Sequence, residues 1–486
     1  MNYRKVILRV SFFAVFLSFE GQNGRAQEQP QEPINAKPIP AARSYPIPVI
    51  DPAGQQDDNI VQDTTNGLQP DTTPLTGVLN ATLGTPEIRH SYWVPGFQYA
   101  STIQSNGYNQ PNSSAWSAYN YLNGNISLLK AWTGSQLAVN YSGGGVLSTN
   151  NSTQGNSYTQ QLALSQAFQW NRLRVQILDQ FAYLPQSGFG FGAGTNLGIP
   201  GVGGSLGPTI PGLSGGVVPN QSIYAALGPQ YSNAGVIQAT YVISPRGSIT
   251  ASGSYGILRF VDPGNVDNNS VGASLGYSYQ ISREDTVGVV FRFSSYQYPG
   301  QPQAFGDKIV NLAYGRKIAG HLALQLYGGP EFTTFRVPIG RQSSTLGGNA
   351  SANLNYGLEK GSLSAGYYHG LTGGSGVLNG STVDQVNFGA SRKLGRIWSA
   401  NINLGYAHNK AVADSTQASF PTYNSWFVGG GVNRPLGRNL NFAMTYTAYI
   451  NASNQPGCTG TSCSTNQISN SITLNLQWHT RPFVLP

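Results

Sequence analysis

The residue types that most often carry enzyme chemistry are sparse in this chain, and their spacing favours no catalytic site. Two Gly-x-Ser-x-Gly matches, Gly203 to Gly207 and Gly212 to Gly216, lie in a glycine-rich segment where such matches arise by chance. A serine nucleophile in this motif needs a sharp turn from a strand into a helix. Neither match has that context, so we expect no enzyme activity.

The histidines show no spacing typical of metal ligands. They are His90, His321, His369, His408 and His479. His369 and His408 come near the ends of loops, where a lipid hydrolase at the rim of a barrel would carry its histidine, but nothing in the sequence pairs either with a nucleophile. The chain also has no phosphate-binding glycine motif. We therefore expect no metal and no cofactor, and a rim-located lipid hydrolase is only the third-ranked interpretation.

The two cysteines predict a disulfide. Cys458 and Cys463 lie five positions apart in a Gly, Ser and Thr-rich stretch, and a second pair of metal ligands is absent. A local disulfide that closes a surface loop fits an exported protein.

The N-terminus has the pattern of a signal peptide. Arg4 and Lys5 precede an apolar stretch from Val10 to Phe19, and small residues surround a cleavage position after Ala26. The apolar stretch is too short for a membrane-spanning helix. We assign residues 1–26 to the signal peptide.

Residues 27–90 form a proline-rich, acidic segment. It carries eight acids and three bases, for a net charge of −5, whereas residues 91–486 carry ten acids and 20 bases, for a net charge of +10. Such a composition predicts disorder, and we expect this segment to lie in the periplasm.

The composition of the whole chain excludes two classes of protein. Only 9% of residues are charged and 39% are hydrophobic, whereas 11% are aromatic and 61 are glycine. A helical membrane protein needs runs of about 20 apolar residues, and a disordered chain has few aromatics. The mixture fits a β-sheet with lipid on one face and water on the other.

Apolar and polar residues alternate in about 18 short segments after residue 91, which is the period of a β-strand with two unlike faces. The segments are 97–105, 116–131, 136–147, 162–170, 173–183, 234–243, 248–259, 271–279, 287–293, 308–316, 322–334, 349–358, 362–370, 383–392, 398–406, 423–433, 440–448 and 468–478. The connections between these segments alternate between short and long. The pattern predicts an all-β, transmembrane, antiparallel up-and-down β-barrel, for which 16 strands is the alternative count.

Residues 91–486 resemble outer-membrane β-barrel proteins of Gram-negative bacteria, porins in particular. The resemblance is one of pattern and no motif of a named family is present. It implies an outer-membrane location, short turns in the periplasm, long loops outside, and contact with lipid and with the barrel assembly machinery. Ile472, Leu474, Leu476 and Trp478 look like the terminal assembly signal of such proteins, although the chain continues to Phe483 and beyond.

Basic residues gather in or beside the short turns. They are Lys130, Arg172, Arg246, Arg283, Arg316, Lys317, Lys360, Arg392, Lys393, Arg434 and Arg438. This periplasmic basic rim fits three interpretations: an anchor for anionic lipid headgroups, a docking surface for the acidic segment 27–90, or the ordinary polarity of turns.

Charged residues are rare on the polar parity that would line a pore. Arg174, Arg292 and Glu331 have this parity, and without rings of charge strong ion selectivity is not expected. Asp179 has the apolar parity of its segment, which predicts either a β-bulge or a misassigned strand.

The longest loop, 185–232, holds 13 glycines and six prolines and no charged residue. In porins the loop after the fifth strand narrows the channel, so the resemblance implies an uncharged constriction here; a mobile surface loop is the alternative. An apolar constriction would be lined by Phe189, Phe191, Leu197, Ile199 and Ile210.

Together these patterns predict a passive, porin-like outer-membrane channel for small neutral or weakly charged solutes. The first alternative is a blocked structural or export-associated barrel that binds a surface polymer or partner. Basic charge confined to turns argues against nucleic-acid binding. The sequence leaves homo-oligomerisation open.

Overall fold

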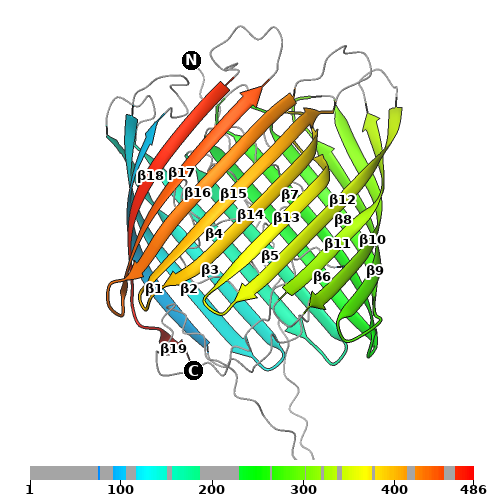
Figure 1. Ribbon diagram of the computed structural model, residues 1–486, viewed down its shortest axis with the longest axis horizontal. Helices are drawn as coiled ribbons and strands as arrows, with labels where there is room; N and C mark the ends of the chain where they lie inside the picture. Colours follow the sequence, from blue (N-terminus) through cyan, green and yellow to red (C-terminus); the bar gives the residue numbers. More distant parts are fainter. Residues whose placement is uncertain are drawn as a thin grey trace, which may run out of the picture. The chain divides into compact units, whose positions relative to one another are not determined.

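Each alternating segment of the sequence forms one β-strand, and 18 of these strands close into an antiparallel barrel (Figure 1). The structure is a computed structural model. It describes residues 75–76, 91–105, 116–149, 156–185, 229–262, 265–301, 303–318, 322–336, 342–374, 378–412, 422–453 and 466–485. No helix in these ranges is long and apolar enough to cross a membrane. The predicted fold class and strand number are confirmed.

The strands extend past the alternating segments, mainly toward the long loops. Their bounds are β1 (Ser91–Ser105), β2 (Trp116–Trp132), β3 (Ser135–Thr149), β4 (Ser157–Gln169), β5 (Leu173–Leu184), β6 (Gln230–Ser244), β7 (Gly247–Phe260), β8 (Asn268–Gln280), β9 (Asp285–Gln297), β10 (Ala304–Ile318), β11 (Leu322–Arg336), β12 (Gln342–Leu358), β13 (Gly361–Thr372), β14 (Ser381–Leu394), β15 (Trp398–Ala411), β16 (Thr422–Pro435), β17 (Leu440–Ser453), β18 (Asn466–His479) and β19 (Phe483–Leu485).

The barrel closes where β1 pairs with β18. Phe97 lies opposite Trp478, and Ile103 lies opposite Ile472. The short strand β19 then pairs with the start of β1, where the rings of Trp93 and Phe483 stack with centroids 5.0 Å apart. Both edges of the sheet are therefore satisfied, as a membrane barrel requires.

Short and long connections alternate around the barrel, as predicted, so one end carries the short turns and the other the long loops. Glycines with positive φ occupy tight positions at the short-turn end, Gly134 at +83° and Gly437 at +97°. Only glycine adopts this conformation without strain, which is why these turns stay short.

The two faces of the barrel differ sharply in polarity. On β8 the outward side chains of Val271 and Leu275 are 57% and 55% exposed, whereas Ser274 and Ser278, on the inner face, are buried. The same alternation runs along the other strands. An apolar outer face with a polar inner face is the arrangement of a barrel whose outside contacts lipid.

Asp179 lies on the outward face of β5 without any bulge. The register of β5 with β4 and with β6 is continuous past Asp179, and the only register shift among the described pairings lies between Val242 and Ser244. Both expectations for Asp179, a bulge or a misassigned strand, are therefore wrong. The Tyr255 hydroxyl donates to Asp179 Oδ2 (2.6 Å) and the Asn233 amide donates to Oδ1 (3.2 Å), so neighbouring strands supply partners for an acid on the apolar face.

Candidate functional site on the inner face of the barrel

The inner face is built mainly from hydroxyl and amide side chains that pair across neighbouring strands. Small alternating residues leave room for such pairs, and each pair satisfies two polar groups at once. Examples are Thr102 with Thr473 (2.8 Å), Ser252 with Ser274 (2.6 Å) and Ser425 with Asn451 (2.7 Å). The wall is therefore polar and uncharged over most of its area.

Much of this wall is covered. Thr250, Ser425 and Thr473 have no exposed surface although they lie on the inner face. Short side chains packed between longer neighbours of the same wall are covered by those neighbours. The small residues therefore form the base of a closely packed polar wall.

The inward charges away from the turns, among the described strands, form one cluster on β9, β10 and β11. Arg292, Ile309 and Glu331 lie in one row across these strands, because Ile309 is opposite Arg292 on one side and Glu331 on the other. Arg174 also lies on the inner face but only two residues after the turn before β5, at the short-turn end of the barrel. Two of the three predicted pore-lining residues are thus brought together and the third is separate.

Asp307 belongs to this cluster, although its inward position was not predicted from the sequence. It lies on the inner face of β10, opposite Ser294 and Thr333, with no exposed surface, and neither carboxylate oxygen has a hydrogen-bond partner that meets distance and angle criteria. The parity of Asn311 would have revealed it. However, Phe305 and Ile309 share that parity, so both faces of β10 looked apolar.

The end of β13 and the residues after it lie against the inner face of β8–β10. Leu371 packs on Tyr296, Tyr298 and Phe305, and its amide donates to Glu331 Oε1 (3.3 Å). The Gly373 carbonyl accepts hydrogen bonds from the Asn268 amide (2.9 Å) and the Tyr298 hydroxyl (3.2 Å).

This connection after β13, at the long-loop end, therefore covers the charged cluster. The predicted constriction residues fall elsewhere. Phe189, Phe191, Leu197, Ile199 and Ile210 lie outside the described residues, as do Cys458 and Cys463 with their predicted disulfide.

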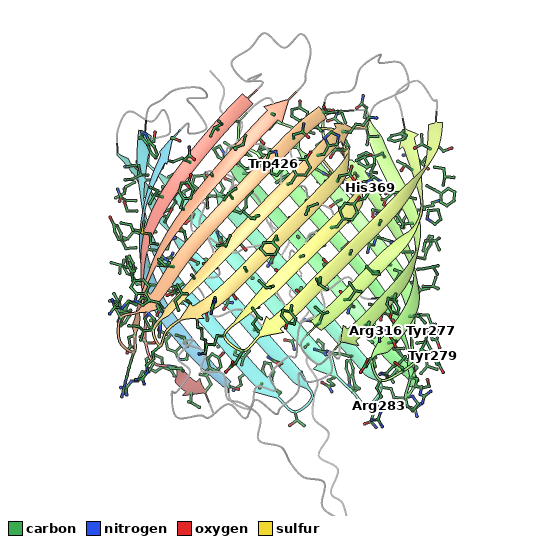
Figure 2. All side chains as sticks on the ribbon, viewed as in Figure 1. Tyr277, Tyr279, Arg283, Arg316, His369 and Trp426 are labelled. Carbon is green, nitrogen blue, oxygen red and sulfur yellow. The ribbon has the colours of Figure 1, made fainter. Side chains whose placement is uncertain are left out.

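The two histidines considered for a rim hydrolase lie on the outward face in one transverse row. The row runs His369, Asp384, His408 and Asn424 across β13–β16. His369 Nδ1 is 2.7 Å from Asp384 Oδ1 and His408 Nδ1 is 2.7 Å from Asn424 Oδ1. Figure 2 places His369 and Trp426 toward the long-loop end. The partners of both rings are thus an acid and an amide, and neither ring is hydrogen-bonded to a serine or cysteine of the described residues.

The predicted basic rim residues all lie in or beside the short connections between strands. Figure 2 shows two of them, Arg283 and Arg316, at the short-turn end of the barrel. The side chain of Lys317 is outside the described part. Tyr277 and Tyr279 lie on the outer face of β8 close to this end of the barrel.

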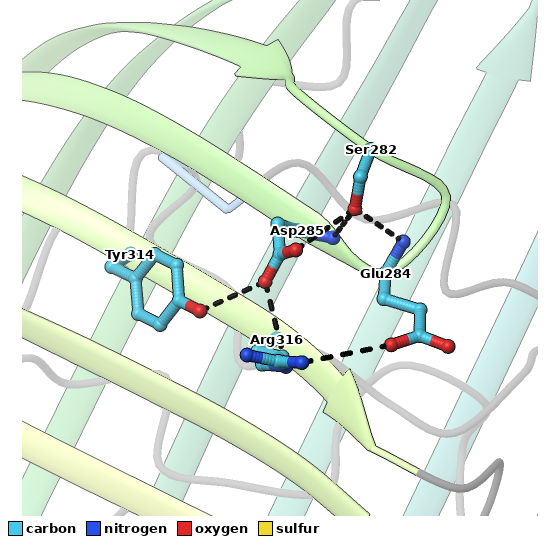
Figure 3. A network of polar contacts seen from close by, with 5 residues as sticks. All are labelled: Ser282, Glu284, Asp285, Tyr314 and Arg316. Carbon is cyan, nitrogen blue, oxygen red and sulfur yellow. Dashed lines mark hydrogen bonds and ion pairs between the residues drawn. The ribbon is translucent and has the colours of Figure 1, made fainter.

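Arg316 is held by neighbouring acids, at 3.6 Å from Asp285 and 3.9 Å from Glu284 (Figure 3). Asp285 also accepts hydrogen bonds from Tyr314 (2.8 Å) and Ser282 (2.9 Å). Part of the rim charge is therefore already balanced within the barrel.

No group of three or more potential metal ligands occurs in the described ranges. The closed sheet, the apolar outside and the polar inside define a class: a transmembrane antiparallel β-barrel.

Comparison with known proteins adds no family. No protein-family model matches the chain and no curated protein matches it. Among solved structures it is similar to the outer membrane protein OpdK from Pseudomonas aeruginosa, with 10% identity, a TM-score of 0.41, and 80% of this chain and 99% of that chain covered. It is also similar to OpdL from Pseudomonas aeruginosa (9%, 0.41, 81% and 99%) and to the FrpB iron transporter from Neisseria meningitidis (7%, 0.40, 81% and 82%). The geometry of the barrel itself therefore identifies it as a transmembrane barrel.

Proposed function

We propose that this protein is a passive channel in the outer membrane that admits small neutral or weakly charged solutes. The observation that carries the proposal is the inner face, where hydroxyl and amide groups line an 18-stranded barrel. Barrels of about 16 to 18 strands enclose an aqueous lumen, whereas barrels of about eight are filled by their own side chains. A polar, uncharged wall offers hydrogen bonds to sugars and similar solutes.

The orientation follows from the same proposal. The short-turn end faces the periplasm, so that β1 starts and β18 ends there, and residues 27–90 lie on that side. The basic rim then meets the phospholipid headgroups of the inner leaflet. The outward side chains of Leu474, Leu476 and Trp478 on β18 present the surface that the assembly machinery would bind, and the outer face contacts lipid.

The cluster of Arg292, Asp307 and Glu331 is the proposed contact point for solutes. It is the one place at depth where the described inner wall carries charge. Arg292 is its partly exposed member, whereas Asp307 and Glu331 are buried and act through their charge. Arg174 would line the entrance near the short turns. If segment 185–232 also folds inward, Phe189, Phe191, Leu197, Ile199 and Ile210 would narrow the path further.

One observation favours the second candidate function, a blocked barrel that binds a partner through its outer loops. Leu75 and Thr76 lie buried against the inner face, so the chain itself covers part of the lumen wall. A rim-located hydrolase has less support, because neither His369 nor His408 is hydrogen-bonded to a serine or cysteine within the described residues.

The test is electrical and osmotic. Purified, refolded protein in planar bilayers should show steady open levels, and proteoliposomes should swell in isosmotic neutral sugars faster than protein-free liposomes. Wild-type protein that never conducts and never permits swelling, even after removal of residues 28–88, would favour the blocked barrel. Release of fatty acid that depends on His369 or His408 would instead favour the hydrolase.

A further inference from the structure

Two described residues of the N-terminal region lie inside the barrel. Leu75 and Thr76 are buried, with 8% and 1% of their surface exposed. They rest on the inner face of β8–β11 near the short-turn end, since Ser278 lies two residues before the end of β8.

The contacts are of three kinds. The hydroxyls of Thr76 and Ser278 share a hydrogen bond of 2.9 Å, and the Tyr327 hydroxyl donates to the carbonyl oxygen of Leu75 (2.6 Å). The Leu75 side chain packs on Val290, Ala313 and Tyr327. Both polar and apolar parts of the dipeptide are thus matched by the wall.

The wall is hollowed at this place by three glycines on adjacent strands. A Cβ on Gly276 would lie 2.4 Å from Thr76 Cβ, and one on Gly288 would lie 2.7 Å from Thr76 Cγ2. A Cβ on Gly315 would lie 3.0 Å from Leu75 Cδ1. Any other residue at these positions would meet the dipeptide. A glycine within a strand often marks such a close approach.

The apolar residues of the niche also indicate that this part of the wall receives an apolar side chain. Val290 and Ala313 lie on an inner face that is otherwise mostly hydroxyl and amide, and each pairs in register with one of the glycines, Val290 with Gly276 and Ala313 with Gly288. A wall that served only water and polar solutes would gain nothing from an apolar patch beside glycines. A wall that receives a leucine side chain would.

We propose that these residues form a docking niche for Leu75–Thr76, through which the chain holds this dipeptide against the lumen wall and limits the passage of solutes. The niche consists of Gly276, Ser278, Gly288, Val290, Ala313, Gly315 and Tyr327. Docking stands on the contacts alone, and only the effect on passage rests on the proposed channel function.

The first experiment tests docking without reference to transport. In a background with Cys458→Ser and Cys463→Ser, the pair Thr76→Cys and Ser278→Cys should form a disulfide under mild oxidation, detected as a linked peptide by mass spectrometry. The control pair Thr76→Cys and Gln477→Cys places the second thiol on the inner face of β18, two residues before its end. Cross-linking to position 278 but not to position 477 supports docking. Equal cross-linking at both positions, or none at 278, overturns it.

The second experiment tests the effect on passage in planar bilayers. Oxidised Thr76→Cys, Ser278→Cys protein should conduct less than the same protein after reduction. The double variant Leu75→Ser, Thr76→Gly, which leaves every strand unchanged, should raise conductance. Gly276→Val should do the same because its Cβ would lie 2.4 Å from Thr76 Cβ and displace the dipeptide. The matched control is Gly366→Val, an inward glycine of β13 whose Cβ would lie nearest to the Asn353 side chain, at 3.1 Å, and not to the dipeptide.

Two failures remain distinguishable. If cross-linking succeeds and conductance is the same in the oxidised and reduced protein, docking stands and the limit on passage is wrong. If no variant conducts at all, the channel function itself is wrong, and the limit on passage falls with it.

Discussion

Tyrosine hydroxyls on the outer face bind polar side chains of the next strand. Tyr99 donates to Asn120 (2.9 Å) and Tyr446 donates to Asn470 (2.9 Å), and the same contact occurs from Tyr367 to Asp384 (3.1 Å) and from Tyr406 to Asn424 (3.0 Å). A polar group that faces hydrocarbon without a partner is costly. The tyrosine hydroxyls therefore allow asparagine and aspartate to occur on the outer face, because they supply these side chains with a hydrogen-bond partner.

Tyr255→Phe tests this pairing at its most demanding position. It removes the 2.6 Å donor to Asp179 while leaving the ring over the strand. We expect a loss of about 1–3 kcal/mol in the free energy of unfolding, as for other polar groups left without a partner. Urea-induced unfolding in lipid vesicles measures it.

The control is Tyr277→Phe, an outward tyrosine on β8 that makes no hydrogen bond within the described part of the chain. In addition, Asp179→Leu combined with Tyr255→Phe should be less destabilised than Tyr255→Phe alone. Equal stability of the two single variants would show that the Asp179 contact contributes nothing.

At the scale of strands, alternation predicted most of the fold. All 18 segments are strands, and the residues of β8 and β18 fall on the faces that parity assigns. Parity failed for β10, where Phe305, Ile309 and Ala313 point inward and conceal Asp307. These apolar residues face inward because they pack on residues that are distant in the sequence: Phe305 packs on Leu371 and Ala313 packs on Leu75.

The site was less predictable than the fold for the same reason. Periodicity tells which face a residue occupies but not what approaches that face. Thr76 and Ser278 are 202 residues apart, and nothing local to either position indicates the other. The docking niche and the inward end of β13 therefore needed the structure.

The short strand β19 allows a test of which aromatic residue the assembly machinery uses. Phe483 stacks on Trp93, but barrel closure depends on β18. Removal of residues 481–486 should cost about 0.5–1.5 kcal/mol from the lost stack and leave assembly intact. Trp478→Ala should impair assembly far more, because Trp478 lies on the outer face of β18, 46% exposed.

Assembly can be followed as the heat-dependent shift in gel mobility of membrane fractions. Phe483→Ala serves as the milder control for the truncation. If the truncated chain fails to assemble while Trp478→Ala assembles normally, the signal lies in β19 rather than β18.

The connection after β13 gives a second prediction at this scale. Asn268→Ala together with Tyr298→Phe removes both hydrogen bonds to the Gly373 carbonyl. The connection should then cover the charged cluster less often, and single-channel conductance should rise. Tyr279→Phe, on the outer face, is the control, and an increase of the same size in that variant would contradict the role of the connection.

For the molecule as a whole, charge is arranged so that the lumen stays close to neutral. Residues 91–486 carry a net charge of +10, and the bases of the periplasmic basic rim lie at the short-turn end, whereas the inner cluster combines one arginine with two acids. Fixed charge inside a pore sets ion preference more than charge at a solvated rim, where salt screens it. We expect a weak cation preference.

Reversal potentials in a KCl gradient measure this preference. Glu331→Gln should shift the reversal potential toward that of anions and Arg292→Gln should shift it toward that of cations. Lys360→Gln, at a short turn, is the control and should leave the potential nearly unchanged. Shifts in the same direction for both cluster variants would show that the cluster does not face the conducting path.

The closure of β1 on β18 has a consequence for biosynthesis. Thr102 and Thr473, which share a hydrogen bond across the seam, are 371 residues apart. A chain interrupted anywhere before β18 retains the first strand with an unsatisfied edge, and such an edge invites pairing with other chains. Completion of the seam thus works as a check of integrity: only a chain translated through β18 becomes a sealed cylinder, and every shorter fragment keeps an unpaired strand edge.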